Sequence, residues 1–238
     1  GVTEVEKRAV LEVVREVGGK EVYVMDEPMA AAIGAGLDIE ASEASMIADI
    51  GGGTTDVAIL SLGGLVVSTS LRYAGDKMSE AVIAYIRKKK GILIGMKTAE
   101  DLKVSVGSAM VEKDSNGEPI VRTVNARGRD LVSGLPKTFE VTNIDMEEAL
   151  RESVDTIIDA IKSTVEKAPP EIAADIAEKG MMLSGGGSLI ENLDKLISMR
   201  TGMEVNTADN PYEAVAIGTG KSLDNIEKLK TYAEIKIR

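Results

Sequence analysis

The residues best placed to do chemistry lie in one glycine-rich segment, Asp49-Ile-Gly-Gly-Gly-Thr-Thr-Asp56. Apolar runs on both sides predict two strands joined by a hairpin turn, instead of the strand-to-helix turn of a dinucleotide-binding fingerprint. Gly51, Gly52 and Gly53 would let successive backbone N–H groups converge on one point, which makes an anion nest suited to phosphate oxygens. A plain glycine turn that binds no ligand is the alternative interpretation.

Oxygen-bearing side chains flank these glycines. Thr54 and Thr55 would add hydroxyl donors to the nest. Asp49 is placed to hold Mg2+ through its waters, because Mg2+ prefers carboxylate oxygen and dehydrates reluctantly. The alternative for Asp49 is a carboxylate that is satisfied within the protein and holds no metal.

A second glycine cluster, formed by Gly185, Gly186 and Gly187, lies between a predicted strand and a predicted helix. Glycine at these positions permits close approach to the backbone. The group that approaches could be a flat ligand or the preceding strand. The sequence does not decide between the two.

Glu100 and Lys103 lie three residues apart and share one face of a predicted helix. The simpler interpretation is a surface ion pair worth about 0.2–0.5 kcal/mol. The functional interpretation is a pair that contacts a ribose and the edge of an adenine. Spacing by itself favours the surface ion pair.

The segment Gly218-Thr-Gly-Lys-Ser222 has the ending of a Walker A loop, but Val215 occupies the position where that loop needs a glycine. The segment also joins two predicted helices, near 211–219 and 222–232, instead of a strand and a helix. We therefore interpret Gly218 and Gly220 as residues of close packing or helix capping.

The order of the predicted elements places these residues on an α/β fold. Strands alternate with helices at both ends of the chain, around a stretch of helices and short strands at 76–145. The predicted core subdomain comprises residues 37–75 and 146–220, and the stretch between them is a smaller inserted α+β subdomain. Residues 1–36 supply a helix, a strand and a second helix, and residues 221–238 supply a helix that returns toward them.

Composition limits the classes of function. A formal charge of -11 and the lack of a long basic cluster argue against nucleic-acid binding, and the short run Arg87–Lys90 suits the C-terminal end of a helix. The chain has no Cys and no His, which excludes thiol chemistry, imidazole acid–base catalysis and histidine metal sites. Without a signal peptide or a long apolar run, we expect a cytoplasmic protein.

Taken in chain order, three of these segments resemble the actin–Hsp70–hexokinase superfamily. Asp49 to Asp56 resembles its second phosphate loop, Glu100-x-x-Lys103 resembles its adenosine-contacting helix, and Ser184 to Gly187 resembles its adenosine loop. Three segments in one order are more specific than any one of them. The resemblance implies an actin-like ATPase domain with a ribonuclease H-like core that binds ATP or ADP with Mg2+.

Within this superfamily the chain resembles the MreB family of cell-shape filament proteins, from its first residue to about Leu229. The segments that carry the resemblance are 1–10, 27–34, 75–78, 128–132 and 134–137. It implies a cytoskeletal protein that self-associates into filaments and governs bacterial cell shape. It also implies a membrane adaptor of the RodZ type as a partner and a place at the inner face of the membrane.

The resemblance also assigns a catalytic role to Glu27, which precedes Pro28 at the start of a predicted helix. In the family this glutamate orients the water that attacks the γ-phosphate. A carboxylate that faces the cleft can accept a hydrogen bond from that water. Thr54 and Thr55 match the family's phosphate-loop threonines, one of which is expected to contact the water as well.

The sequence departs from the family pattern at positions that bear on ATP binding and hydrolysis. The family's first phosphate loop, a strand bearing Asp-x-Gly-Thr, does not occur in these 238 residues, and Asp26 and Asp56 stand where glutamate is usual. Because one nest supplies only part of the phosphate contacts, we expect weak ATP binding and slow hydrolysis. The sequence therefore leaves open whether the chain is an enzyme.

The first predicted helix, about 3–17, carries a stripe of valines from Val10 to Val17. This stripe and the helix predicted near 222–232 would expose apolar surface, so we expect a dimer or higher oligomer in which another copy covers them. The alternative function is a nucleotide-independent structural module with a vestigial site. A small-molecule kinase of the same superfamily is disfavoured, because no substrate-binding half with its own catalytic Asp is recognised.

Overall fold

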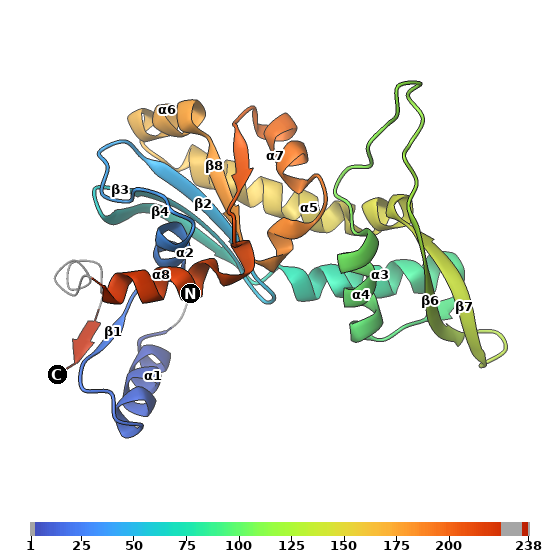
Figure 1. Ribbon diagram of the computed structural model, residues 1–238, viewed down its shortest axis with the longest axis horizontal. Coiled ribbons are helices and arrows are strands. Elements are labelled where there is room, and N and C mark those ends of the chain that lie inside the picture. Colours follow the sequence, from blue (N-terminus) through green and yellow to red (C-terminus); the bar gives the residue numbers. More distant parts are fainter. Residues whose placement is uncertain (1–2, 225–234, 238) are drawn as a thin grey trace.

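The computed structural model describes residues 3–224 and 235–237, and its centre is a five-stranded mixed sheet (Figure 1). The strand order is β4-β3-β2-β8-β9. The antiparallel part consists of β2 (Ser45–Ile50), β3 (Thr55–Ser61) and β4 (Gly64–Leu71). The parallel part adds β8 (Met181–Ser184) beside β2 and β9 (Val205–Thr207) beside β8. The hairpin predicted around the first glycine cluster is the β2–β3 turn.

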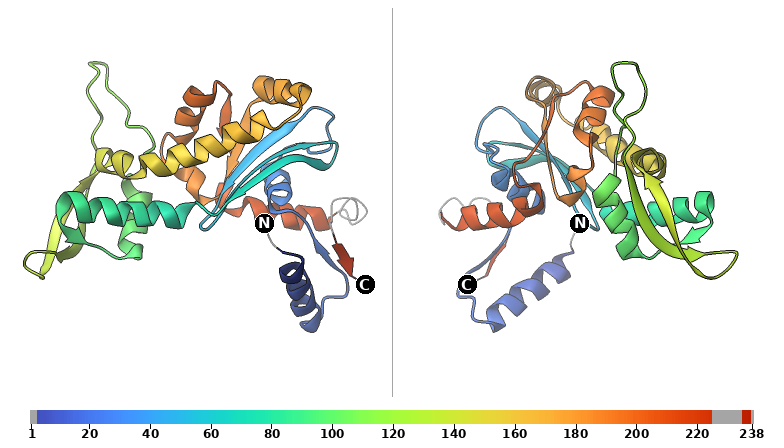
Figure 2. Two further views of the ribbon diagram at one scale, coloured as in Figure 1. Left: turned by 180° about the vertical axis from the view of Figure 1, so that it is seen from behind. Right: turned by 45° about the vertical axis from the view of Figure 1, so that its right-hand side comes forward.

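Helices cover both faces of this sheet (Figures 1 and 2). One face carries α5 (Asn143–Glu166), α6 (Pro170–Lys179) and α7 (Leu193–Thr201). The opposite face carries α2 (Glu27–Gly34) and α8 (Ala214–Leu223). An α/β core of this kind is what the alternation of predicted elements indicates.

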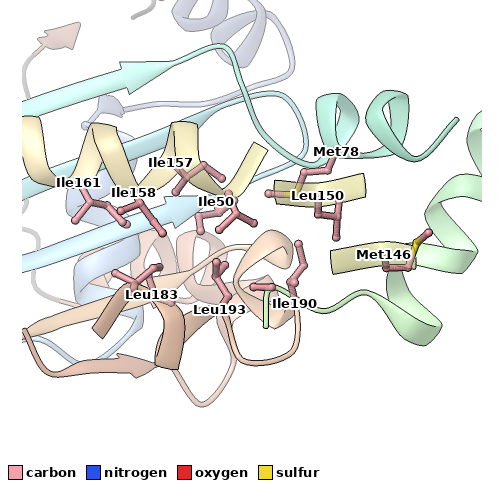
Figure 3. Close-up of a cluster of buried hydrophobic side chains, with 14 of the residues drawn as sticks. Ile50, Met78, Met146, Leu150, Ile157, Ile158, Ile161, Leu183, Ile190 and Leu193 are labelled. Carbon is pink, nitrogen blue, oxygen red and sulfur yellow. The ribbon is translucent and has the colours of Figure 1, made fainter. Parts of the chain in front are cut away.

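The larger apolar core lies between the sheet and α5 (Figure 3). Successive side chains of a strand point to opposite faces, so neighbouring residues of β2 enter different clusters. Ile50 is fully buried and joins Leu150 and Ile157 of α5, whereas Ile47 lies in a smaller cluster with Met29 of α2. The end of β2, from which the glycine turn begins, is therefore held from both sides.

A second unit occupies the stretch in which the sequence predicts an inserted subdomain, at the right of Figure 1. It contains α3 (Gly75–Lys90) and α4 (Met96–Val106). Its antiparallel sheet contains β5 (Ile92–Leu93), β6 (Thr123–Asp130) and β7 (Pro136–Thr142). The chain returns from β7 into α5, which belongs to the core.

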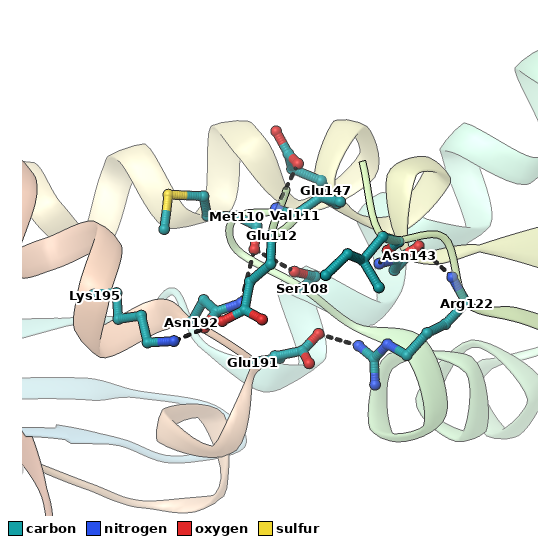
Figure 4. Close-up of polar contacts among 11 residues, drawn as sticks. Ser108, Met110, Val111, Glu112, Arg122, Asn143, Glu147, Glu191, Asn192 and Lys195 are labelled. Atoms are coloured by element: carbon teal, nitrogen blue, oxygen red, sulfur yellow. Dashed lines mark hydrogen bonds and ion pairs between the residues drawn. The ribbon is translucent and has the colours of Figure 1, made fainter. Parts of the chain in front are cut away.

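A polar network fixes this unit to the core (Figure 4). Glu191 is its central residue, because its carboxylate pairs with Arg122 and its carbonyl oxygen accepts a hydrogen bond of 2.9 Å from Ala109 N. Lys195 at the start of α7 pairs with Glu112 at 2.6 Å. The loops that precede β6 and α7 are thereby joined directly.

The two helices α2 and α8 cross at very short distance. A Cβ atom built on Gly218 would lie 1.8 Å from the carbonyl oxygen of Ala30, and one built on Gly34 would lie 1.8 Å from that of Ala214. Only glycine lets the two backbones approach this closely. The interpretation as a close-packing residue is confirmed for Gly218. It is wrong for Gly220, which lies inside α8 and whose Cβ would meet no described atom within 4 Å.

The C-terminal elements differ from the prediction. Because Gly218 contacts α2 instead of ending a helix, α8 continues without a break to Leu223. Most of the helix predicted near 222–232 falls on residues outside the described ones. The strand β10 (Ile235–Ile237) pairs antiparallel with β1 (Val22–Val24), since strand backbone groups need hydrogen-bond partners. The C-terminal segment predicted as a helix therefore includes a strand.

The helix α1 (Glu4–Glu16) lies beside β1, at the end of the molecule opposite the inserted unit (Figure 2). Leu11 is fully buried on its inner side. On the outer side Val10, Val13 and Val17 are 57%, 59% and 82% exposed. The predicted apolar stripe is thus exposed in the structure. No helix among the described residues is both long enough and apolar enough to span a membrane.

Candidate functional site

A cavity of about 530 Å3 opens at the end of β2, between the core and the inserted unit. Its walls come from the β2–β3 turn, the starts of α2 and α3, one face of α4, the loop after β8 and the start of α8 with the turn before it. Pockets that hold small molecules typically measure about 300–1,000 Å3. The cavity is therefore large enough for a nucleotide-sized ligand.

The structure brings most of the predicted site residues to this one cavity. Those that line it are Glu27, Asp49, Gly51, Gly52, Glu100, Lys103, Gly185, Gly186 and Gly187. Gly53, Thr54 and Thr55 are not among the lining residues. The three segments that carry the superfamily resemblance thus line one cavity together with Glu27.

The β2–β3 turn is closed by its own backbone. Gly51 N donates a hydrogen bond of 2.9 Å to the Thr54 carbonyl oxygen, which uses this amide within the turn. The carbonyl oxygens of Gly51 and Gly52 accept hydrogen bonds of 3.1 Å and 2.8 Å from Gly75 N and Asp76 N. The turn and the start of α3 therefore form one rigid edge of the cavity.

Glycine is needed for different reasons in the two glycine clusters. Gly185 has a φ of +79°, and a Cβ there would lie 2.3 Å from the Ile50 carbonyl oxygen. A Cβ on Gly187 would lie 2.4 Å from the Ile50 side chain. The group that approaches this cluster is thus the end of β2, the neighbour of the preceding strand β8.

The first cluster shows the opposite situation. A Cβ on Gly52 or Gly53 would meet no heavy atom of the described residues within 4 Å, and neither residue has a left-handed φ. The fold itself would accept alanine at both positions. Gly52 lines the cavity, and because it has no side chain its backbone is uncovered there.

Asp49 lies beneath the turn and is only 5% exposed. Ser184 of the adjacent strand donates a hydrogen bond of 2.6 Å from its hydroxyl to Asp49 Oδ1. Burial raises the pKa of Asp49 above its ordinary value, the hydrogen bond from Ser184 opposes this, and the nearby charge of Asp56 adds to it. The carboxylate is therefore held in position but disfavoured in its charged form.

Glu27 begins α2 and lines the same cavity. Partial burial raises its pKa, and the charges of Asp56 and Asp49 raise it further. The three carboxylates thus repel one another across the end of β2. Among the described residues, no group of three or more His, Cys, Asp or Glu is arranged to hold a metal directly.

The ion pair of Glu100 and Lys103 is not the surface pair that spacing favours. The Lys103 side chain is 8% exposed, and its Nζ lies 2.5 Å from Glu100 and donates a hydrogen bond of 2.9 Å to the Gly75 carbonyl oxygen. Ser79 donates a second hydrogen bond to Glu100 at 2.8 Å. Partial burial raises the pKa of Glu100, but the hydrogen bonds from Lys103 and Ser79 outweigh it and lower the pKa overall.

Thr55 lies away from the cavity. It is fully buried, and its hydroxyl donates a hydrogen bond of 2.8 Å to the Tyr73 carbonyl oxygen. The sequence interpretation also missed other lining residues, among them Asp76 and Tyr212. Asp76 follows a glycine in a segment that carries the family resemblance, which is a signal that could have found it. We find no sequence signal for Tyr212.

Known proteins are similar to this chain in both sequence and fold. The family model described as "MreB/Mbl protein" matches residues 1–231. The cell shape-determining protein Mbl of Bacillus subtilis is 46% identical over 228 residues, which cover 96% of this chain and 67% of that protein. The cell shape-determining protein MreB of Escherichia coli is 45% identical over 227 residues, which cover 95% of this chain and 64% of that protein. The chain thus spans about two thirds of the length of these relatives.

A crystal structure of MreB 5 of Spiroplasma citri bound to AMPPNP matches with a TM-score of 0.90 and 37% identity, over 97% of this chain and 68% of that one. A second structure of MreB5 was solved bound to ADP and matches with a TM-score of 0.89. The actin-like fold extends to MamK, at a TM-score of 0.76 and 19% identity, over 94% of this chain and 66% of that one. These matches confirm the actin-like α/β fold that the sequence predicts. Its sequence, fold and matched length place this chain in the MreB/Mbl family of actin-like cell shape-determining proteins.

Proposed function

We propose that this chain binds ATP or ADP with Mg2+ in the cavity at the end of β2 and forms part of a cytoskeletal filament that governs cell shape. The observation that supports this most directly is the open glycine turn, with a buried carboxylate beneath it. A relative of the same fold at 37% identity has been crystallised with the ATP analogue AMPPNP. The proposal assigns the same kind of ligand to this cavity.

The phosphate end of the ligand would lie against the turn at Gly52. The lack of a side chain leaves open space there, which lets phosphate oxygens approach the backbone amides. Gly51 contributes shape to this edge, because its own amide is bonded to Thr54. Thr54 and Thr55 would act by holding the turn, one through its carbonyl oxygen and the other through its bond to Tyr73.

A cation is needed for a polyphosphate to enter. Among the described lining residues there are four carboxylates, Glu27, Asp49, Asp76 and Glu100, and a single lysine. Mg2+ is commonly held by one or two carboxylates together with waters and substrate phosphates. Asp49 fits that role, since its position is fixed and a nearby cation would relieve the cost of its charge.

Hydrolysis by these 238 residues would be slow. Glu27 is placed to accept a hydrogen bond from a water in the cavity, and its raised pKa suits a general base. Charge that develops on the phosphate also needs positioned cations or donors. Lys103 is already bonded to Gly75 and Glu100, so it is committed to the wall of the cavity.

Self-association would use two features of the described surface. The valine stripe of α1 is exposed, and burial against a second copy would remove it from water. The charge is also divided unevenly, because residues 76–145 carry a small net positive charge whereas the remainder is strongly acidic. Opposite charges on the two ends favour contact between copies. A cytoplasmic location at the inner membrane face and an adaptor of the RodZ type belong to the same proposal.

The test is thermal unfolding of the purified chain with Mg-ATP, with ATP and EDTA, and with Mg2+ alone. ATP at a hundred times its Kd should add about 2.7 kcal/mol to the free energy of unfolding, and only when Mg2+ is present. Asp49→Ala should abolish this gain. Stabilisation by none of the mixtures would favour the alternative, a structural module with a vestigial site. Sedimentation at micromolar concentration should give a mass above that of one chain.

A further inference from the structure

Part of the wall of the cavity is apolar. Val104 of α4, Ile190 of the loop after β8 and Val215 of α8 line it. Tyr212 completes this wall and is the only aromatic residue among the described lining residues. The cavity is therefore lined by apolar side chains as well as by carboxylates. A ligand with a charged tail and a flat apolar head would match this mixed lining.

The position of Tyr212 is fixed by the second glycine cluster. Tyr212 lies in the short 3-10 helix η2 (Pro211–Glu213). Gly185 N donates a hydrogen bond of 2.8 Å to the Pro211 carbonyl oxygen, which ties η2 to the glycine loop. A Cβ on Gly186 would lie 3.2 Å from Tyr212 Cδ2. Glycine at 186 thus gives the ring its room, whereas Gly185 is explained by its contact with β2.

The ring is nevertheless largely open to solvent. Tyr212 is 82% exposed, although it belongs to the wall of a cavity and has apolar neighbours. An aromatic ring that is largely exposed at the wall of a cavity can stack on a planar base. Such stacking contributes about 1–3 kcal/mol per base and tolerates any base, since every base has a π-face.

We propose that Tyr212 is the base-stacking residue of this site and supplies the affinity that distinguishes a nucleoside triphosphate from a bare polyphosphate. This inference rests on the proposed nucleotide binding and adds to it the residue that holds the base. It makes Tyr212 a binding residue, with Gly186 as the residue that positions it. The phosphate end, at Asp49 and Gly52, would act independently of the ring.

The test is isothermal titration of the chain with Mg-ATP and with inorganic Mg-triphosphate. Tyr212→Leu removes the ring and should lower the affinity for Mg-ATP by about 5- to 100-fold, the range that stacking supports. The same variant should bind Mg-triphosphate within about twofold of the original chain, since the phosphate contacts remain. Tyr212→Phe keeps the ring and should retain the affinity for both ligands within about twofold.

Gly186→Ala is a second variant that does not touch the ring itself. Its methyl group would press on the ring edge, so the affinity for Mg-ATP should fall while that for Mg-triphosphate stays. Thermal unfolding without ligand shows that each variant is folded. Unchanged Mg-ATP affinity of the folded Tyr212→Leu variant, or an equal loss for both ligands, would overturn the inference and leave the proposed function intact. Failure of the original chain to bind Mg-ATP would overturn both.

Discussion

Ser184 donates a hydrogen bond of 2.6 Å to Asp49 from the neighbouring parallel strand, at the point where both strands end. This contact joins the two glycine-bearing segments beneath the cavity. It also holds the carboxylate in a fixed direction, although burial raises the pKa of Asp49. The charged form of Asp49 therefore destabilises the free protein, and a bound cation would remove this destabilisation.

This destabilisation predicts an unusual dependence of stability on pH. A raised pKa means that, in the range above the ordinary Asp value, the folded protein binds more protons at Asp49 than the unfolded protein does. Its contribution to stability is therefore present at low pH and is lost as pH rises through the folded-state pKa. In EDTA, Asp49→Asn should stabilise the chain more at pH 7 than at pH 4.

Urea unfolding of both proteins across this pH range measures the difference. The comparison cancels the contributions of Asp130 and Asp145, which give the opposite slope. Hydrogen bonds lower the pKa of Asp130, and at Asp145 partial burial raises the pKa but the hydrogen bonds outweigh it. Mg-ATP should remove the advantage of Asp49→Asn at pH 7, because only the carboxylate can hold the cation. An equal difference at both pH values would contradict the assignment.

The two glycine clusters predict opposite results for alanine. Gly185→Ala places a side chain at a left-handed φ, which costs about 1–3 kcal/mol before the clash with Ile50 is added. Gly52→Ala should change the free energy of unfolding by less than about 1 kcal/mol, since its Cβ enters open space. It should instead lower the affinity for Mg-ATP. Urea unfolding measures the stability of both variants, and titration with Mg-ATP measures their affinity. Loss of stability in Gly52→Ala with unchanged Mg-ATP binding would contradict the different roles of the two glycine clusters.

Lys103→Met tests whether the buried lysine of the ion pair with Glu100 is structural. Met keeps about the length of the side chain but removes the ammonium group that donates to the Gly75 carbonyl oxygen and pairs with the half-exposed Glu100, which leaves Ser79 as their remaining side-chain donor, at a cost of about 1–3 kcal/mol. Lys77→Met is a matched control, because Lys77 also pairs with a glutamate three residues away, at 2.6 Å, but on the exposed surface. It should change stability very little. Equal effects of the two variants in thermal unfolding would refute a structural role for Lys103.

The crossing of α2 and α8 offers a pair of variants within one helix. Gly218→Ala forces the two backbones apart and should destabilise the chain by about 1–3 kcal/mol, and because Glu27 begins α2 it should also weaken Mg-ATP binding. Gly220→Ala enters open space in the same helix and should stabilise it by about 0.5–1 kcal/mol. Calorimetric unfolding of both variants makes the comparison, and destabilisation by Gly220→Ala would be inconsistent with this packing.

Local sequence pattern was sufficient to predict some of the elements that position the site. The turn from Gly51 to Thr54 follows from three glycines between two apolar runs, and a turn depends mainly on its own residues. The same holds for the exposed valines of α1, whose spacing alone places them on one side of the helix. The meeting of the three predicted segments at one cavity followed from the family resemblance and not from local pattern.

The structural role of each glycine and of each charged side chain at the cavity depends on residues that are distant in sequence. A Cβ on Gly185 or Gly187 would clash with Ile50, which lies in another strand, whereas a Cβ on Gly52 would meet no described atom within 4 Å, and no local pattern separates these cases. Lys103 is buried because α3 packs over it, and Tyr212 reaches the cavity because Gly186 leaves it room. The sequence determines which side chains the chain carries. Close packing between remote segments determines which of these side chains stabilise the fold and which remain accessible to a ligand.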